Sequence, residues 1–347
     1  MEKYRFIIVG SGWRSLFYVR VAKALSHHFE LCAMLCRTQE KADRLATEHG
    51  IHTTTSIEEC LEMKPDFIVV AVNKASIAEV SKEWLEKGFT VLCETPASLE
   101  LETLHELWTL HEQGAKLAVA EQYIYYPNYY AITQVLEHEL IGDPYCAVVS
   151  LAHEYHGASL IRNFLKEDMT PFTINGKTFT FPTVETMSRY EQFTDGRIAD
   201  KKRTIAVFEF ADSKVGLYDF DSEQYRSPIR HNYLNIRGPR GEIKDDKIYF
   251  LNNDNIPECK SLEISTHIME MPGKENVMLS SDETAIAQVM YGVAAYARDE
   301  NILSKELNGP VYSLQNALQD SYMTILLNQA IATGKVIKSI RQPWHKY

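Results

Sequence analysis

Residues 6–15 read FIIVGSGWRS and decide the fold of the first part of the chain. The apolar run predicts a buried strand, and the Gly-x-Gly-x-x-Ser pattern that follows predicts a tight turn into a helix. In such a turn the second glycine lets the backbone approach a pyrophosphate, and the helix N-terminus supplies N–H groups. A plain tight turn gives the same pattern, but its place after a buried strand favours a phosphate site. Its expected cofactor contacts are Gly10, Ser11, Gly12, Trp13 and Arg14.

The alternation of apolar strands and helical patterns continues to about residue 122. Further strands are expected at 30–36, 67–72, 90–93 and 117–120. Continuous aliphatic strands separated by helices are typical of a parallel sheet covered on both faces. We therefore predict an α/β fold whose first domain, residues 1–122, is a doubly wound Rossmann domain that binds a dinucleotide.

The pattern changes after residue 122. Residues 205–210 and 216–220 alternate apolar with polar side chains around a turn at 212–214, which predicts an antiparallel hairpin with one wetter face. A last helix is expected at 313–333. The second domain, residues 123–347, is predicted to be α+β with a large open, mostly antiparallel sheet. The last helix is free to pack back on the first domain, and we expect a cleft between the two.

Composition limits the partners. The 347 residues are 45% hydrophobic and 24% charged, as in ordinary globular proteins, with a net charge of −11. The longest basic run is 201–203, so nucleic acid is not an expected partner. The six cysteines show no metal or disulfide spacing, and neither a signal peptide nor a membrane span is evident. We expect a cytoplasmic protein without a membrane partner or a metal.

The residues after the second strand bear on the choice of cofactor. NAD-selective folds usually place an acid here to bind the ribose hydroxyls. This chain has Arg37 and Thr38, which could hold a 2′-phosphate. A surface salt bridge is the other reading of Arg37. The cofactor is therefore predicted to be NADP or NAD, with a slight preference for NADP.

Several stretches together carry a family resemblance. The sequence VLCETP at 91–96 stands where Val-Leu-Cys-Glu-Lys-Pro is found in the Gfo/Idh/MocA family, named for glucose–fructose oxidoreductase and inositol dehydrogenase. Further stretches match in order and spacing over nearly the whole chain: 34–46, 57–61, 126–127, 140–142 and 236–241. The chain thus resembles this family, which implies a Rossmann domain beside an open sheet, with nicotinamide and substrate between them. The resemblance also implies cofactor contacts at Val72, Asn73, Lys74, Glu94 and Thr95.

The chain departs from the family where the chemistry is expected. Thr95 replaces the family lysine. In the helix that carries the family Asp and His at positions i and i+4, the best-matching segment, 157–166, has Arg162 and Lys166. Arginine does not lose its proton in proteins, so Arg162 can only orient or bind an anion. Two cations on one helix face favour a substrate with a carboxylate or phosphate.

Other side chains could replace the missing acid/base pair. Residues 153–156 read HEYH and are expected at the end of a strand, with a helix starting near Gly157. We predict His156 as the acid/base group, because its ordinary pKa suits proton transfer at neutral pH. The alternative is a histidine that only bonds backbone. Lys166 is a second catalytic candidate if it is desolvated, although a solvated lysine is the plainer reading; His153 and Tyr155 are expected to contact substrate.

Residues 121–123 follow the last strand of the first domain, at the sheet edge where ligands collect. Glu121 is expected to contact substrate, Gln122 the cofactor, and Tyr123 to take part in catalysis. The polar stretch 167–200 is read as a lid, a partner arm or a passive surface excursion, and Arg189 is its best candidate for reaching the substrate.

The leading functional prediction is an NAD(P)-dependent oxidoreductase acting on a small polar compound, such as a sugar derivative, a carbonyl or a polyol. Two alternatives stay open. One is an enzyme that recycles bound NAD during glycoside cleavage, as some relatives of the family do. The other is a dinucleotide-sensing protein without chemistry, suggested by Thr95, Arg162 and Lys166. The one-sided sheet of the second domain predicts a homo-oligomer, a dimer or tetramer, through that sheet.

Overall fold

The apolar runs of the first third form a parallel sheet of six strands in the order β3-β2-β1-β4-β5-β6. Strand β1 pairs in parallel with β2 on one side and β4 on the other, and its residues 6–9 are at most 7% exposed. Strand order reverses between β1 and β4, which is where open α/β sheets bind ligands. The predicted α/β class and parallel sheet are confirmed. The elements up to residue 125 are β1 (Tyr4–Val9), α1 (Ser15–Ala24), β2 (Phe29–Leu35), α2 (Gln39–His49), β3 (Thr53–Thr54), α3 (Ile57–Glu62), β4 (Phe67–Val70), α4 (Ile77–Glu86), β5 (Thr90–Cys93), α5 (Leu101–Glu112), β6 (Leu117–Val119) and the 3-10 helix η1 (Tyr123–Tyr125).

The computed structural model describes residues 2–262, 268–269, 277–299 and 312–345. The chain divides into two compact units, one made of residues 1–127 and 265–318, the other of residues 128–264 and 319–347. Residues 265–318, which the sequence analysis placed in the second domain, thus group with the first unit. The short strands β15 (Ile268–Met269) and β16 (Val277–Met278) and helix α8 (Ser281–Ala297) belong to this part.

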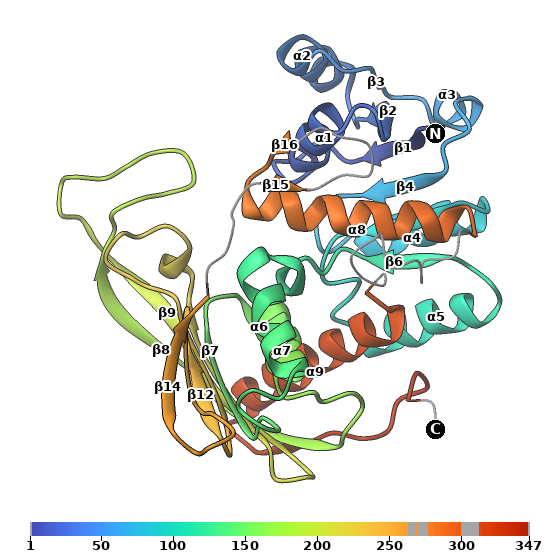
Figure 1. The fold of residues 1–347 in the computed structure, drawn as a ribbon. Coiled ribbons are helices and arrows are strands. Elements are labelled where there is room, and N and C mark those ends of the chain that lie inside the picture. The colour runs from blue at the N-terminus through green and yellow to red at the C-terminus, as the bar shows by residue number, and fades with distance from the viewer. Residues whose placement is uncertain (1, 263–267, 270–276, 300–311, 346–347) are drawn as a thin grey trace. The chain divides into compact units, whose positions relative to one another are not determined.

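Helix α8, drawn in orange in Figure 1, packs beside α1 and against β4 and β5. Its first turn is closed by a capping box, in which the Ser280 hydroxyl accepts from the Glu283 N–H and the Glu283 carboxylate accepts from the Ser280 N–H. Its other end is held by Arg298, whose guanidinium donates to Asp66 at 2.8 and 2.9 Å. Because both ends are fixed, α8 is an integral layer of the first unit.

The second unit is built on nine strands in the order β14-β13-β12-β11-β7-β10-β9-β8-β17. Among the described strand pairs of this nine-stranded sheet, β7–β10 is parallel and the others are antiparallel, so the predicted mostly antiparallel sheet is confirmed. The strands are β7 (Cys146–Ser150), β8 (Phe172–Val184), β9 (Ile198–Phe210), β10 (Val215–Asp221), β11 (Tyr233–Gly238), β12 (Gly241–Lys244), β13 (Lys247–Leu251), β14 (Pro257–Ser261) and β17 (Ile337–Lys338). The helices are α6 (Pro127–Glu137), α7 (Glu154–Phe164), the 3-10 helix η2 (Ser222–Tyr225) and α9 (Leu314–Thr333).

The polar stretch 167–200 forms much of a long hairpin. Strands β8 and β9 have 13 residues each and pair from Phe172–Phe210 out to Val184–Ile198. The loop that joins them appears yellow-green in Figure 1. Arg189 lies in this loop and is exposed.

Candidate functional site

The turn after β1 has the geometry that its glycines predict. Gly10 has φ +114°, and a side chain there would place its Cβ 2.3 Å from the carbonyl oxygen of Ala71. Packing against the end of β4 therefore excludes every residue but glycine. Ser15 is fully buried, and its hydroxyl donates to the Gly10 carbonyl at 3.1 Å, which fixes the start of α1 against the turn.

Gly12 is different, because no contact with the described residues requires it to be glycine. It is exposed, its φ lies outside the left-handed region, and a Cβ built on it meets no described atom within 4 Å. A bare backbone that faces open space at the N-terminus of a helix is what a pyrophosphate needs for close approach. The loop therefore fits the phosphates of a dinucleotide, with Gly12 as the point of closest approach.

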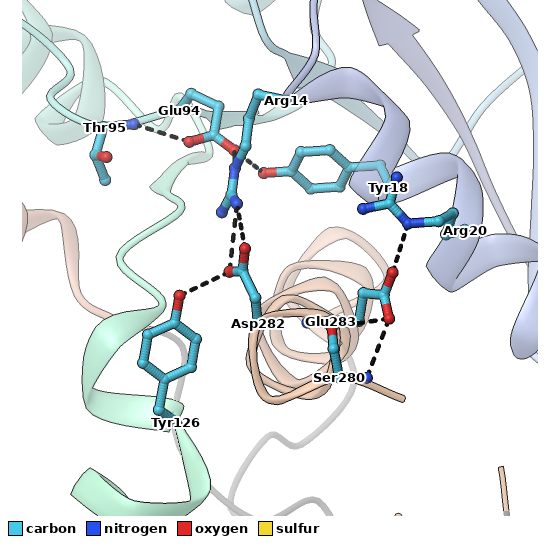
Figure 2. Close-up of polar contacts among 9 residues, drawn as sticks. All are labelled: Arg14, Tyr18, Arg20, Glu94, Thr95, Tyr126, Ser280, Asp282 and Glu283. Carbon is cyan, nitrogen blue, oxygen red and sulfur yellow. Dashed lines mark hydrogen bonds and ion pairs between the residues drawn. The ribbon is translucent and has the colours of Figure 1, made fainter. Parts of the chain in front are cut away.

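Arg14, expected to contact phosphates, turns its side chain to two carboxylates instead (Figure 2). Its Nε donates to Glu94 Oε1 at 2.7 Å, and its Nη1 lies 3.1 Å from Asp282 Oδ2. Glu94 follows β5, and Asp282 lies in the first turn of α8. The Arg14 cation is thus already paired within the first unit, and residue 14 can offer a phosphate only its backbone.

Three more side chains complete this Arg14 network. The Tyr18 hydroxyl donates to the same Glu94 oxygen at 2.7 Å, and the Tyr126 hydroxyl donates to Asp282 Oδ1 at 2.9 Å (Figure 2). With its amide oriented to satisfy its neighbours, Gln122 accepts from Arg14 Nη2 at 3.1 Å and donates to the Ala120 carbonyl. The network therefore joins residues from the ends of β5 and β6 to α1 and α8.

The pKa values of the network keep its protons in place. Burial alone would lower the pKa of Arg14, but Glu94 and Asp282 outweigh it and raise the pKa above its ordinary value. Burial, and then the negative charge of the carboxylate each one bonds, raises the pKa of Tyr18 and of Tyr126 far above neutral. The arginine stays charged and both tyrosines stay neutral donors at any physiological pH.

Thr95 and the residues after β6 lie close by in the chain. The Thr95 N–H is 3.4 Å from Glu94 Oε2, on the carboxylate oxygen that Arg14 leaves uncontacted (Figure 2). Glu121 is fully buried and accepts from the Tyr123 N–H at 2.8 Å. The Tyr123 ring, half-buried, packs edge-on against Tyr126 at 4.9 Å. Their predicted roles in substrate binding and catalysis stay predictions.

Two further cations follow the ends of β2 and β4. Arg37 and Lys74 are exposed, and neither forms a hydrogen bond or ion pair with any residue that the structure describes. The Thr38 hydroxyl accepts from the Lys41 N–H at 3.4 Å and so serves as the N-cap of α2. Burial raises the pKa of the Cys36 thiol, against an opposing hydrogen bond from Ser11.

The remaining predicted contacts border the glycine turn or the helix that follows. Val72 lies beside the turn, with Cγ1 at 3.2 Å from a Cβ built on Gly10. Asn73 accepts from the Ser76 hydroxyl at 3.2 Å and helps to start α4. Trp13 is 43% exposed and packs edge-on against Phe17.

In the second unit, the predicted strand through residue 156 is wrong. Strand β7 ends at Ser150 and α7 begins at Glu154, so His153 is the N-cap residue and His156 lies in the first turn. Residues three apart on a helix are neighbours, and the two imidazole rings accordingly lie 4.6 Å apart. His156 is only 3% exposed, and the His153 N–H donates to the Tyr225 hydroxyl at 2.9 Å.

The prediction that Arg162 and Lys166 share one helix face is also wrong. Helix α7 ends at Phe164, and Lys166 lies beyond it with φ +56° and an exposed side chain. Arg162 is 3% exposed, and its Nε donates to the fully buried Asp320 at 2.9 Å. This ion pair already neutralises Arg162, which removes the reason for expecting it to bind an anionic substrate.

One side chain near the start of α7 was not expected. The Tyr218 ring packs on Gly157, where a Cβ would come within 2.4 Å of it. Tyr218 is 1% exposed, and its hydroxyl has no hydrogen-bond partner among the described residues. Burial, then the nearby negative charge of Glu154, raises its pKa well above the ordinary value. Tyr155, predicted to bind substrate, is likewise buried, at 1% exposed.

In the part of the chain that the structure describes, no helix combines the length and apolarity needed to cross a membrane. Nor do the described residues bring three or more His, Cys, Asp or Glu side chains together in a group that could hold a metal ion.

The sheet order, the glycine turn and the helix behind it define a dinucleotide-binding Rossmann protein. Residues 4–123 match the Gfo/Idh/MocA family model, described as an oxidoreductase family with an NAD-binding Rossmann fold. This match covers about a third of the chain, and the resemblance expected from the sequence is confirmed. No curated protein sequence matches the chain.

Solved structures of similar fold extend over the whole chain. An NAD-binding oxidoreductase from Klebsiella pneumoniae superimposes with a TM-score of 0.73 at 12% identity, covering 98% of this chain and 100% of its own. An oxidoreductase from Agrobacterium radiobacter in complex with NAD+, L-tartaric acid and magnesium has a TM-score of 0.71 at 13% identity. The match covers 97% of this chain and 98% of that one. The WlbA dehydrogenase from Chromobacterium violaceum, in complex with NADH and UDP-GlcNAcA, has a TM-score of 0.66 at 13% identity. The match covers 99% of this chain and 97% of that one. At such identities the likeness shows the fold alone.

Proposed function

We propose that the protein is an NAD(P)-dependent oxidoreductase acting on a small polyhydroxylated substrate, such as a sugar derivative or a polyol. The observation that carries this proposal is the turn after β1, in which packing requires Gly10 while Gly12 is bare without a packing reason. The family match over residues 4–123 supports the cofactor class. The L-tartaric acid and UDP-GlcNAcA bound to two proteins of similar fold support the substrate class.

NADP stays the slightly preferred cofactor in this proposal. Arg37 stands at the end of β2 in place of an acid and is exposed and unpaired among the described residues. A guanidinium there suits a 2′-phosphate better than the two hydroxyls of an unphosphorylated ribose. Thr38 contributes less than the sequence suggests, because its hydroxyl already caps α2.

We place the proton transfer on His156, with His153 and the tyrosines around the first turn of α7 as substrate contacts. This cluster offers two imidazoles and the phenols of Tyr218 and Tyr225 as hydrogen-bonding groups, with the Glu154 carboxylate 3.9 Å from His153 Nδ1. With Arg162 paired to Asp320, the described residues no longer favour a charged substrate over a neutral one. Hydroxyl groups of a sugar or polyol are therefore the better chemical match.

The test begins with the purified full chain. Mass spectrometry and absorbance identify any dinucleotide that co-purifies, and a panel of polyols, sugars and the corresponding carbonyl compounds is then assayed at 340 nm. Net reduction or oxidation of the dinucleotide with a neutral polyol or sugar is the expected result. Cleavage of glycosides with retained cofactor and no net NADH points to cofactor recycling instead, and saturable binding without turnover points to a sensor.

The His156 assignment has its own test. His156→Ala is expected to abolish turnover while dinucleotide affinity stays the same, because His156 belongs to the second unit and not to the glycine turn. Tyr249→Phe is the control: it changes an aromatic side chain of the same unit on strand β13, away from the His156 cluster, and should leave turnover unchanged. Unchanged turnover in His156→Ala removes this residue from the mechanism.

We also propose a homo-oligomer formed through the open face of the nine-stranded sheet. Side chains on this face from three neighbouring strands, Val207, Leu217 and Val148, are only half-buried, and Ile205 is 42% exposed. Light scattering after size exclusion should give a dimer or tetramer, and Ile205→Lys should shift it toward the monomer. A monomeric wild-type chain contradicts the proposal.

A further inference from the structure

The Arg14 network contains more negative than positive charges. Arg14 supplies one positive charge, and Glu94 and Asp282 supply one negative charge each, so the net charge of the three is −1. Their side chains are 19%, 12% and 26% exposed, which limits screening by water. Tyr18 and Tyr126 donate hydrogen bonds but add no charge, because burial and the carboxylates raise their pKa values.

The ion pair next to the network does not cancel this excess. Further along α1, Arg20 pairs with Glu283 of α8, which is a balanced pair (Figure 2). Glu121, the buried carboxyl group after β6, brings no positive charge. Within these ion-paired groups the negative excess therefore stays with Glu94 and Asp282, whereas Lys74, which follows β4, is exposed and its charge is screened by water.

The position of the network in the sheet indicates which part of a bound dinucleotide this excess negative charge would act on. Glu94 follows β5, and Gln122, which accepts from Arg14, follows β6. These two strands, with β4, form the second of the two mononucleotide-binding halves of the fold, and their carboxyl ends lie on the ligand side. In a nicotinamide dinucleotide bound as proposed above, this second half receives the nicotinamide nucleotide.

Only one charge on the dinucleotide differs between its two redox forms. The nicotinamide ring is a cation when oxidised and neutral when reduced, whereas the phosphates are the same in both. A fixed negative excess on the nicotinamide side therefore acts differently on the two forms, and only such a difference can shift their balance.

We infer that the Arg14–Glu94–Asp282 network makes this site bind the oxidised dinucleotide in preference to the reduced one, with Asp282 of α8 as the residue that sets the excess. The inference rests on the proposed function and deepens it, because a site that favours the oxidised form is suited to remove hydride from a hydroxylated substrate. Without Asp282, Arg14 and Glu94 would form a neutral pair.

Calorimetric titration of the full chain with NAD+, NADH, NADP+ and NADPH tests the inference without any turnover. Asp282→Asn keeps an oxygen that can accept from Arg14 and Tyr126 but removes the charge. The ratio of the reduced-form Kd to the oxidised-form Kd is expected to fall about 3- to 10-fold, as for one partly screened charge. Glu94→Gln, which removes the other negative charge, should lower the ratio in the same direction.

Glu283→Gln is the matched control, one residue along the same helix turn. It also removes a negative charge, but from the balanced pair with Arg20, and glutamine preserves the capping box of α8. Its Kd ratio should equal that of the wild type, and the Tm of each variant verifies folding.

The outcomes separate the two proposals. A wild-type chain that binds none of the four dinucleotides refutes the proposed function itself. A chain that binds them, but whose Kd ratio is unchanged or raised in both Asp282→Asn and Glu94→Gln, overturns the inference and leaves the proposed function standing. An equal fall of the Kd ratio in Glu283→Gln also overturns the inference, because any negative charge on this surface would then have the same effect.

Discussion

Alanine at Gly12 and alanine at Gly10 should have opposite consequences, although the two residues are almost adjacent. At Gly12 a methyl group meets no described atom within 4 Å, so the protein has room for it. At Gly10 the same methyl group would lie 2.3 Å from the Ala71 carbonyl oxygen on a backbone with φ +114°. Gly12→Ala should therefore weaken dinucleotide binding, whereas Gly10→Ala should lower the stability of the fold.

The expected magnitudes follow from these contacts. Strain at a positive φ, with a backbone clash that must be relieved, should cost Gly10→Ala about 3 kcal/mol of unfolding free energy. For a unit of this size that lowers Tm by roughly 6–12 °C. Gly12→Ala should stay within about 0.5 kcal/mol of the wild type. Loss of a close backbone contact to an anionic phosphate is expected to weaken dinucleotide binding about 10- to 100-fold.

Differential scanning calorimetry gives Tm, and fluorescence or calorimetric titration gives the dinucleotide Kd, for the wild type and both variants. If Gly12→Ala binds as tightly as the wild type, the phosphates do not pass over this glycine and the assignment of the loop is wrong. If Gly12→Ala is as destabilised as Gly10→Ala, the position is not open as described.

Three further predictions concern charged residues. Arg162→Met removes the Arg162 charge that pairs with the buried Asp320 and should lower the free energy of unfolding by about 3–5 kcal/mol. The double variant Arg162→Met/Asp320→Leu should recover most of this loss. Urea unfolding measures both, and a double variant no more stable than the single one contradicts the importance of the ion pair. Lys166→Gly relieves a left-handed backbone and should leave stability unchanged or raise it by up to about 1 kcal/mol; a loss of affinity for anionic sugars in this variant would instead restore Lys166 as a substrate contact. Arg37→Ala should weaken NADPH binding about 10-fold and NADH binding less than about 2-fold; equal losses for both cofactors would argue against a 2′-phosphate site.

The sheet of the first unit could be predicted from sequence because its signals are local. Each buried strand is a short aliphatic run, and the glycine turn follows directly on β1. The antiparallel hairpin of β9 and β10 was likewise visible from alternation around a turn. Such patterns depend on neighbouring residues alone, so one sequence suffices to read them.

The candidate site was harder to predict because its decisive contacts are distant in sequence. Asp282 is 268 positions from Arg14, and Asp320 is 158 positions from Arg162. Nothing near either arginine indicates that its charge is already paired. Of these partners only Asp282 had a usable local signal, since the capping box of Ser280 and Glu283 marks the start of α8.

The start of α7 was misjudged for a different reason. The residue at its N-cap is His153, whose side chain makes no capping bond, and Tyr155, two residues further on, is of a type that also suits a strand. Helix geometry is imposed there by packing, with Gly157 against Tyr218 and Ile161 against Gly216. Packing of this kind has no counterpart in a propensity scale.

The order in which the chain is made has a consequence for how the first unit is completed. Residues 128–264 are inserted between the N-terminal sheet and α8, so the ribosome synthesises most of the second unit before the helix that carries Asp282. At ~5–20 residues per second, α8 follows the N-terminal sheet by roughly 10–30 s. During that interval the nascent sheet lacks one of its covering layers, and the Arg14 guanidinium has only Glu94 as a carboxylate partner. The second unit is in the same position, because it needs residues 319–347. Neither unit is encoded as one contiguous piece, so neither can be completed during translation before most of the chain has been made.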